Sequence, residues 1–189
     1  MNIGTLVLSI IFAFLAYFAW KREGETNTQR DVADIGVSTP VLAEGYFERP
    51  PGRDVVYLDF DGVLHPGNSE SFEFRDNFER IVRRHPGVDI VLSTDWRSSA
   101  DLSYLRGRFS QDIARRIVGC TPRLNGEHAR YLEIKHVNDK FGIDRWLAID
   151  DSSELFPIDC PNLVLVDRYT GISGKGELIV VDAFSRAFA

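Results

Sequence analysis

The chain has 189 residues, enough for one ordinary domain and an appendage. Hydrophobic residues make up 44% and charged residues 26%, a balance typical of a globular fold and not of a disordered chain. The formal charge of −6, from 22 basic and 28 acidic residues, gives no strong nucleic-acid-binding signal, because such proteins usually carry a basic excess. Two cysteines without a CxxC motif, Cys120 and Cys160, argue against a redox or zinc site and favour a reducing compartment.

The first predicted element is a membrane anchor over residues 2–20. This run of 19 residues contains no charged side chain, and at ~1.5 Å per residue such a helix reaches about 28 Å, close to the thickness of the hydrocarbon core. Tyr17 and Trp20 occupy one end, where aromatic side chains prefer the membrane interface. Lys21 and Arg22 follow directly, so the positive-inside rule predicts a single-pass membrane protein whose remaining residues are cytoplasmic.

A cleaved signal peptide and a buried helix are the alternatives for this apolar run. A signal peptide needs a basic region before the run and a small-residue exit. No basic residue precedes this run, and the bulky Trp20 stands at its exit, which favours the anchor. Residues 21–52 are polar, contain glycine and proline, and show no sustained period. They are predicted to form a flexible linker before a domain over residues 53–189.

This domain alternates continuous apolar runs with amphipathic segments. The apolar runs are typical of strands buried on both faces, and they occupy residues 55–58, 90–93, 146–149 and 163–166, with a weaker candidate at 117–119. Apolar residues recur at helical spacing over 74–82 and 130–141. Such alternation predicts an α/β fold with a mainly parallel sheet. The segment 177–187 stays open between a final strand and a helix.

Polar residues follow three of the predicted strands. Asp59, Asp61 and Gly62 come directly after the first strand, Thr94 and Asp95 close the second, and the pair Asp150–Asp151 closes a third. In an open α/β sheet, ligands bind outside the carboxyl ends of the strands. We therefore expect these side chains to meet at one edge of the sheet.

The residues from Leu58 to Leu64, with a hydroxyl at Ser93 or Thr94 and the Asp150–Asp151 pair, resemble the motifs of the haloacid dehalogenase (HAD) superfamily. The resemblance spans residues 55–151. It implies a three-layer α/β/α Rossmann-like fold with a minimal cap, because the stretch between the first two motifs has no room for a cap domain. The ending around Thr94 is similar to that of small HAD domains associated with nucleic-acid repair proteins.

The resemblance also implies a chemistry for these positions. Asp59 would attack phosphorus to form an aspartyl-phosphate, and Asp61 would act as acid and then base. Mg²⁺ would offset the repulsion between the carboxylates and the substrate phosphate, with Asp59, Asp61 (through its main-chain carbonyl) and Asp150 as ligands. Thr94 would bind a phosphoryl oxygen, helped by backbone N–H groups beside Gly62 and Asp95.

Two assignments stay open at this point. The family's cation that steadies the phosphate is Arg130, which lies 20 residues before Asp150, or Lys135, which lies 15 before it, or neither. In the last case both side chains belong to a solvated helix face. Asp151 is either a further metal ligand or the first residue of a helix-capping box that ends at Glu154.

Three neighbouring residues have interpretations of their own. Asp95 places a negative charge beside the phosphate-binding loop and is expected to pair with Arg97. His65 is interpreted as a turn residue, with contact to the substrate as the alternative. Trp96 is expected to pack under the site and not to stack on a base.

The sequence thus predicts a membrane-anchored, Mg²⁺-dependent phosphomonoester hydrolase. Because an uncapped site does not enclose a small metabolite, the expected substrate is a phosphorylated protein, nucleotide or nucleic-acid end. A catalytically silent HAD fold that serves as an interaction module at the membrane is the alternative, and a phosphotransferase or mutase is a third possibility. The sequence carries no signal for an oligomeric state.

Overall fold

The computed structural model describes residues 45–67 and 69–189. The predicted anchor over residues 2–20 and most of the predicted linker lie outside the described residues. Within the described part, no helix is both long enough and apolar enough to span a bilayer.

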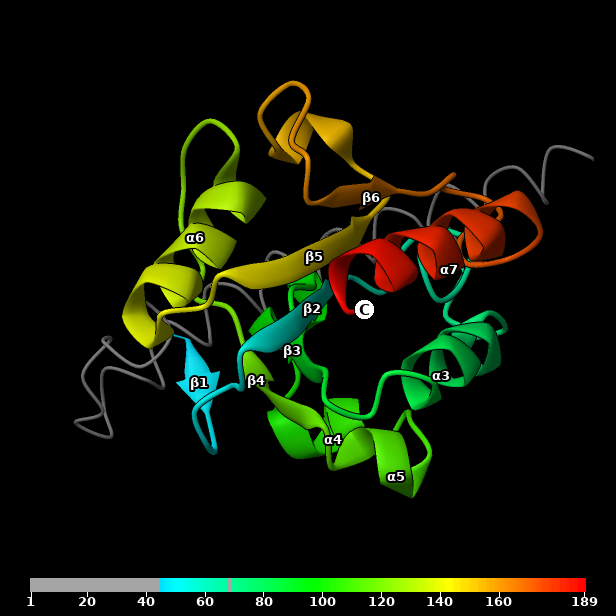
Figure 1. Cartoon of the computed structure of the whole chain (residues 1–189), viewed down its shortest axis with the longest axis horizontal. Helices are drawn as coiled ribbons and strands as arrows, with labels where there is room; N and C mark the ends of the chain where they lie inside the picture. Colours follow the sequence, from blue (N-terminus) through cyan, green and yellow to red (C-terminus); the bar gives the residue numbers. More distant parts are fainter. Residues whose placement is uncertain (1–44, 68) are drawn as a thin grey trace, which may run out of the picture. The chain divides into compact units, whose positions relative to one another are not determined.

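The domain is built on one six-stranded sheet with the strand order β1-β4-β3-β2-β5-β6 (Figure 1). The strands are β1 (Tyr46–Phe47), β2 (Asp54–Leu58), β3 (Asp89–Leu92), β4 (Ile117–Cys120), β5 (Arg145–Asp150) and β6 (Leu163–Leu165). The pairs from β4 to β6 are parallel, and the edge strand β1 pairs with β4 in the antiparallel sense. The predicted mainly parallel sheet is therefore confirmed.

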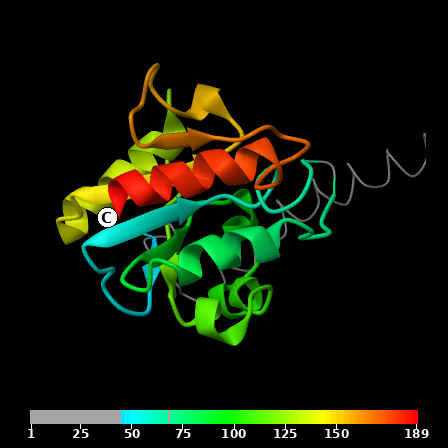
Figure 2. The ribbon, with the colours of Figure 1, turned by 45° about the vertical axis from the view of Figure 1, so that its right-hand side comes forward.

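Helices cover both faces of the sheet (Figure 2). They are α3 (Arg75–Arg83), α4 (Leu102–Arg106), α5 (Gln111–Ala114), α6 (Ala129–Phe141) and α7 (Lys175–Ala187), with two short 3-10 helices, η1 (Asp95–Ser98) and η2 (Ser153–Leu155). Because alternate strand residues point to opposite faces, Val56 and Leu58 pack with α3, α4, α5 and α7, while Val55 and Tyr57 pack with α6. The result is the expected three layers.

The structure decides one open prediction, the segment 177–187, and corrects another, the end of the predicted linker. Residues 177–187 belong to the helix α7, which buries Val180 and Phe184 against the sheet. The predicted linker over 21–52 differs from the structure at its end, because Tyr46–Phe47 forms the edge strand β1. A strand of two residues is too short to show a period. The next turn is held by Arg49, whose guanidinium donates to both carboxylate oxygens of Asp89 at 2.8 and 2.6 Å.

The strand order has a functional consequence. The chain runs from β2 outward to β3 and β4, and then returns to place β5 on the other side of β2. The carboxyl ends of β2 and β5 therefore flank the point at which the direction of winding changes, where open α/β sheets bind their ligands. Between β2 and α3, and between β4 and α6, the described residues form no helix or strand that could serve as a cap domain.

Candidate active site

Three carboxylates gather at the carboxyl ends of β2 and β5. Asp59 directly follows β2, and its N–H donates to the carbonyl oxygen of Ile149 at 3.2 Å. Asp150 ends β5, and Asp151 comes next. One carboxylate oxygen from each of these three aspartates lies within 4.8 Å of the others. Asp59 and Asp150 are only 5% and 2% exposed, so water cannot replace the partners that their charges need.

Arg130 reaches this cluster from the first turn of α6. Its Nη1 lies 3.4 Å from Asp59 Oδ1 and 3.4 Å from Asp150 Oδ2. Nη1 is buried and makes no hydrogen bond within the described residues. The guanidinium thus approaches both carboxylates with a donor that is still available to a further acceptor.

The cluster carries more negative charge than Arg130 balances. Burial raises the pKa of Asp59 well above its usual range, although the nearby Arg130 opposes the shift. Burial likewise raises the pKa of Asp150 to about 6, again against the effect of Arg130. Three close oxygen donors with uncompensated charge suit a hard divalent cation such as Mg²⁺. The residues present therefore fit the ion expected from the sequence.

Gly62 is required by the backbone beside this cluster. Its φ of +72° lies in the left-handed region, and a Cβ at this position would overlap the Asp151 carboxylate. The absence of a side chain lets the turn after β2 pass directly over Asp151.

Asp61 stands at the mouth of the site and is held from two sides. Trp96 Nε1–H donates to Asp61 Oδ2 at 3.0 Å, and His65 Nε2 lies 3.8 Å from Asp61 Oδ1. Burial raises the pKa of the Asp61 carboxyl, while His65 and the Trp96 hydrogen bond act in the opposite direction. A raised pKa favours the protonated form, which a general acid needs.

The interpretation of His65 as a turn residue is incomplete. The side chain is fully buried and packs against Phe72 and Trp96, and its Nε2 has no hydrogen-bond partner within the described chain. Trp96 packs under the site as expected, with its ring against Phe60 and Phe72. Its hydrogen bond to Asp61 has no signature in the sequence, because only the fold brings the two residues together.

The two candidate hydroxyls have different surroundings. The parallel pairing of β2 with β3 places Asp59 and Ser93 side by side at the sheet edge. Ser93 Oγ is buried without a hydrogen-bond partner in the described residues, whereas Thr94 Oγ1 accepts from the N–H of Trp96 at 3.4 Å and begins η1. Both hydroxyls therefore keep an O–H donor without an acceptor among the described residues, and Ser93 and Thr94 both remain candidates for contact with a phosphoryl oxygen.

Asp95 pairs with Arg97 as expected, although the contact between the two side chains is long. Asp95 is largely exposed, and its carboxylate lies 3.9 Å from Arg97 Nη1 and 3.7 Å from Arg130 Nη2. The short contact of Arg97 is instead to Glu133, at 2.7 Å. Glu133 also lies 3.8 Å from Arg130 Nε, so it links the two buried arginines. Its position three residues after Arg130 on a helix is the signal from which this contact could have been predicted.

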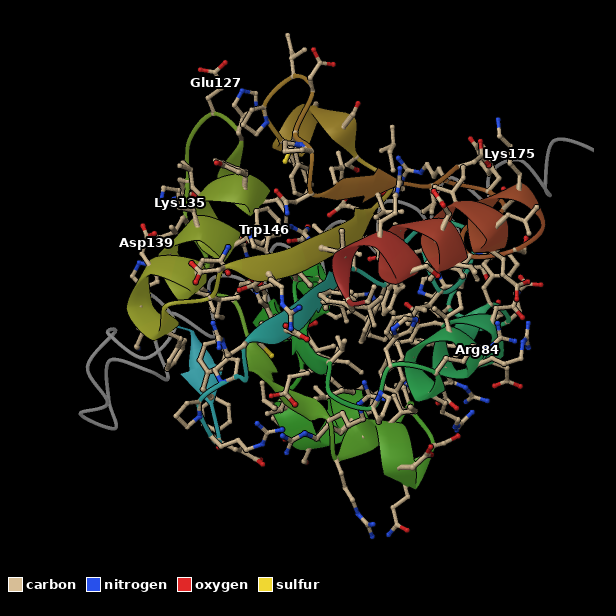
Figure 3. All side chains as sticks on the ribbon, viewed as in Figure 1. Arg84, Glu127, Lys135, Asp139, Trp146 and Lys175 are labelled. Carbon is tan, nitrogen blue, oxygen red and sulfur yellow. The ribbon has the colours of Figure 1, made fainter. Side chains whose placement is uncertain are left out.

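Lys135 lies away from the site, and its assignment to phosphate binding is not supported by its position. Figure 3 shows it on the outer side of α6, where its ammonium donates to Asp139 at 2.9 Å. The cause is helical geometry, since five residues after Arg130 correspond to a rotation of about 140° around the helix axis.

Asp151 does not cap a helix. The following 3-10 helix η2 begins after Ser152 and has no side-chain cap. Asp151 Oδ1 instead accepts the hydroxyl of Ser152 at 2.9 Å, and its side chain is 7% exposed beside Gly62. The capping-box interpretation is therefore wrong, and the side chain is placed with the carboxylate cluster.

Comparison with protein families gives one finding of direct relevance. Residues 55–175, which contain every site residue described above, match the family described as the HAD domain in Swiss Army Knife RNA repair proteins. Comparisons with curated proteins and with solved structures give no match.

Proposed function

Because the chain belongs to the family of HAD domains in Swiss Army Knife RNA repair proteins, we propose that it is a Mg²⁺-dependent phosphomonoesterase that acts on a phosphorylated nucleic-acid end. The observation that carries the proposal is the meeting of Asp59, Asp150 and Asp151 with the buried Arg130 at one sheet edge, with Asp61 at its mouth.

The first step forms an aspartyl-phosphate. A carboxylate oxygen of Asp59 attacks phosphorus, and the bond between phosphorus and the ester oxygen breaks. Asp61, whose raised pKa favours the protonated form, gives its proton to the departing oxygen. Arg130 and the hydroxyl of Ser93 or Thr94 bind the equatorial phosphoryl oxygens, since each of these buried side chains has a donor without an acceptor in the described residues.

The second step reverses the roles. Asp61, now ionised, takes a proton from water, and the water oxygen attacks phosphorus. The bond from phosphorus to Asp59 breaks, which releases inorganic phosphate and restores the carboxylate.

Mg²⁺ is proposed as the resident ion of this site. Asp59, Asp150 and Asp151, together with the Asp61 main-chain carbonyl, would hold it. The ion would neutralise the carboxylates and the phosphate so that the two anions can approach each other.

The proposed substrate follows from the open site and from the family. The described residues include no cap domain that would enclose a small molecule. A site of this kind accepts the end of a polymer, and the RNA repair proteins of the family act in a context where such ends arise. The leaving group is then the terminal ribose oxygen of a nucleic acid.

Phosphate release by the purified full-length chain tests this proposal. With Mg²⁺, it should release phosphate from RNA or DNA oligonucleotides that carry a 3′ or 5′ terminal phosphate. Asp59→Asn should abolish release and still fold, because the side chain keeps its size. A wild-type chain that is inert toward oligonucleotide, nucleotide and aryl phosphates would contradict the proposal and favour a silent interaction module.

We also propose that residues 2–20 anchor the protein in a membrane with the catalytic domain in the cytoplasm. The support is the uncharged apolar run followed by Lys21 and Arg22. The protein should remain in the membrane fraction after extraction with alkaline carbonate. A reporter that works only in the cytoplasm should be active when it is fused after Ala189. Activity of a reporter that works only outside the cytoplasm would overturn the proposed orientation.

A further inference from the structure

A group of aromatic side chains and one arginine lies beside Asp61. The guanidinium carbon of Arg108 is 4.6 Å from the ring centre of Tyr104, 5.6 Å from that of Phe72 and 5.9 Å from that of Trp96. Arg108 also donates a hydrogen bond to the hydroxyl of Tyr104. Tyr104 is 51% exposed, so a large aromatic side chain remains accessible at the surface of this group.

Arg108 is unusual among the arginines in its choice of partners. Most of the described arginines reach a carboxylate, as Arg83 reaches Asp112 at 2.7 Å. Arg108 makes no ion pair within the described residues, and its buried Nε–H has no hydrogen-bond acceptor there. Its charge is therefore held among aromatic rings and left without an anion.

The position of this group follows from the hydrogen bond between Trp96 and Asp61. Asp61 protonates the oxygen that leaves phosphorus, so the leaving group has to lie next to the Asp61 carboxyl. The Trp96 indole donates to that carboxyl at 3.0 Å, and Arg108 lies near the same indole. Trp96 therefore joins the Arg108 cation, and through it the accessible ring of Tyr104, to the carboxyl beside which the leaving group has to lie.

We propose that Tyr104 and Arg108 form a subsite for the nucleotide that carries the scissile phosphate or adjoins it. This inference rests on the proposed function, because it takes the leaving group to be a nucleotide. A base stacks on Tyr104, and Arg108 pairs with the neighbouring phosphodiester.

General chemistry supports a nucleic acid as the ligand of this pair. Bases stack on aromatic rings and on guanidinium planes without regard to sequence, and a cation among rings keeps its attraction for phosphate. A chain with net charge −6 has no broad basic surface. Binding of a polymer at this site would then depend on a few local contacts, and the loss of one should be measurable.

The test compares two substrates of the full-length protein. One is a short RNA with a terminal phosphate, and the other is glycerol phosphate, which has no base and no phosphodiester. Tyr104→Ala and Arg108→Gln should each lower kcat/KM for the RNA about tenfold or more, the usual effect of removing one stacking side chain. Activity on glycerol phosphate should change less than twofold.

Arg84→Gln is the matched control. Arg84 is an exposed arginine between α3 and β3. It precedes the amino end of β3, whereas the site lies at the carboxyl ends of the strands. It should leave both activities unchanged. Arg108→Lys keeps the positive charge but lacks the planar guanidinium. If the subsite is correct, it should lower kcat/KM for the RNA, but by less than Arg108→Gln does. It also provides a second variant if Arg108→Gln folds poorly.

The outcomes separate this inference from the proposed function. Equal loss on both substrates, or loss on neither, would overturn the subsite. If the wild type hydrolyses no phosphomonoester, the proposed function fails. The subsite is then tested by RNA binding, measured as the fluorescence anisotropy of a labelled RNA. Weaker RNA binding by Tyr104→Ala than by wild type would support the subsite, while equal binding would overturn it.

Discussion

The indole N–H of Trp96 donates a hydrogen bond to Asp61 Oδ2 at 3.0 Å and so connects the loop after β3 to the loop after β2. The other Asp61 oxygen lies 3.8 Å from His65 Nε2. The hydrogen bond from Trp96 orients the Asp61 carboxyl before the substrate binds. Pre-organisation of this kind is a general requirement of acid–base catalysis.

Trp96→Phe should therefore lower kcat about tenfold, because it removes one hydrogen bond to an ionisable group and keeps an aromatic ring in the core. The Trp96 hydrogen bond favours ionised Asp61. Without it the pKa of Asp61 should rise further, and the limb of the pH–rate profile that belongs to Asp61 should move to higher pH.

Trp146→Phe is the control for this substitution. Trp146 packs against Tyr57 and Tyr131 on the α6 side of the sheet, away from Asp61. It should leave the pH–rate profile in place. An unchanged profile for Trp96→Phe as well would show that the hydrogen bond does not act on Asp61.

Arg130 and Lys135 provide a pair of substitutions on one helix with opposite expectations. Arg130→Gln should lower kcat/KM at least about 100-fold, because it removes the buried cation that contacts Asp59 and Asp150. Lys135→Gln should have no effect, since its exposed ammonium pairs with Asp139 on the outer side of α6. Steady-state kinetics on a terminal phosphate measure both. A large effect of Lys135→Gln would contradict the placement of α6.

The raised pKa of Asp150 predicts how stability depends on pH without metal. The folded protein holds this proton up to about pH 6, whereas the unfolded chain releases it near 3.8. The folded state therefore binds more protons in this window, and its free energy of unfolding should fall as pH rises from about 4 to 6. Asp150→Asn should remove this part of the pH dependence and raise the melting temperature at pH 7.5.

Addition of Mg²⁺ should change this pattern. The ion binds ionised carboxylates, so 10 mM Mg²⁺ should raise the melting temperature of the wild type by about 5 °C at pH 7.5 and much less at pH 5. Asp150→Asn should respond weakly at both pH values. Equal stabilisation of wild type and variant would show that Mg²⁺ binds elsewhere.

The fold was largely predictable from the sequence, because its strands are buried on both faces and appear as unbroken apolar runs. The short edge strand Tyr46–Phe47 was missed for the opposite reason, since it has only two residues and a polar neighbourhood. Asp59, Asp61 and Asp150 follow strand ends, so the sheet alone brings them to one edge.

The supporting residues of the site were harder to predict. Trp96 reaches Asp61 from a distant segment of the chain, and no local pattern marks this contact. Glu133 lies three residues after Arg130, but its shorter contact, to Arg97, again joins distant segments. His65 lies four residues after Asp61, yet no pattern in the sequence shows that its side chain is buried. The choice between Arg130 and Lys135 depended on the rotational phase of α6, which begins at Ala129 after a left-handed His128. A shift of one residue in that start would turn Arg130 away from Asp59, and the sequence does not specify the start so closely.

Arg97 and Glu133 form a buried pair with a distinct energetic signature. Arg97 Nη2 donates to Glu133 Oε2 at 2.7 Å, and the two side chains are 6% and 4% exposed. Burial raises the pKa of Glu133 and lowers that of Arg97, in each case against the attraction of the partner. Both shifts favour the neutral forms. The desolvation cost of burying each charge is therefore larger than the stabilisation that the ion pair provides.

Single and double substitutions should therefore behave differently. Glu133→Met should lower the free energy of unfolding by roughly 3 kcal/mol, because it leaves the Arg97 charge buried and unpaired. Arg97→Met should cost less, because Glu133 keeps its contact with Arg130 Nε at 3.8 Å and its hydrogen bond from the Leu124 N–H at 3.1 Å. The double variant should be more stable than either single one, since apolar side chains then replace both charges. Urea unfolding of the wild type, the two single variants and the double variant gives the four free energies of a double-mutant cycle. Additive costs in the double variant would show that the two charges do not interact.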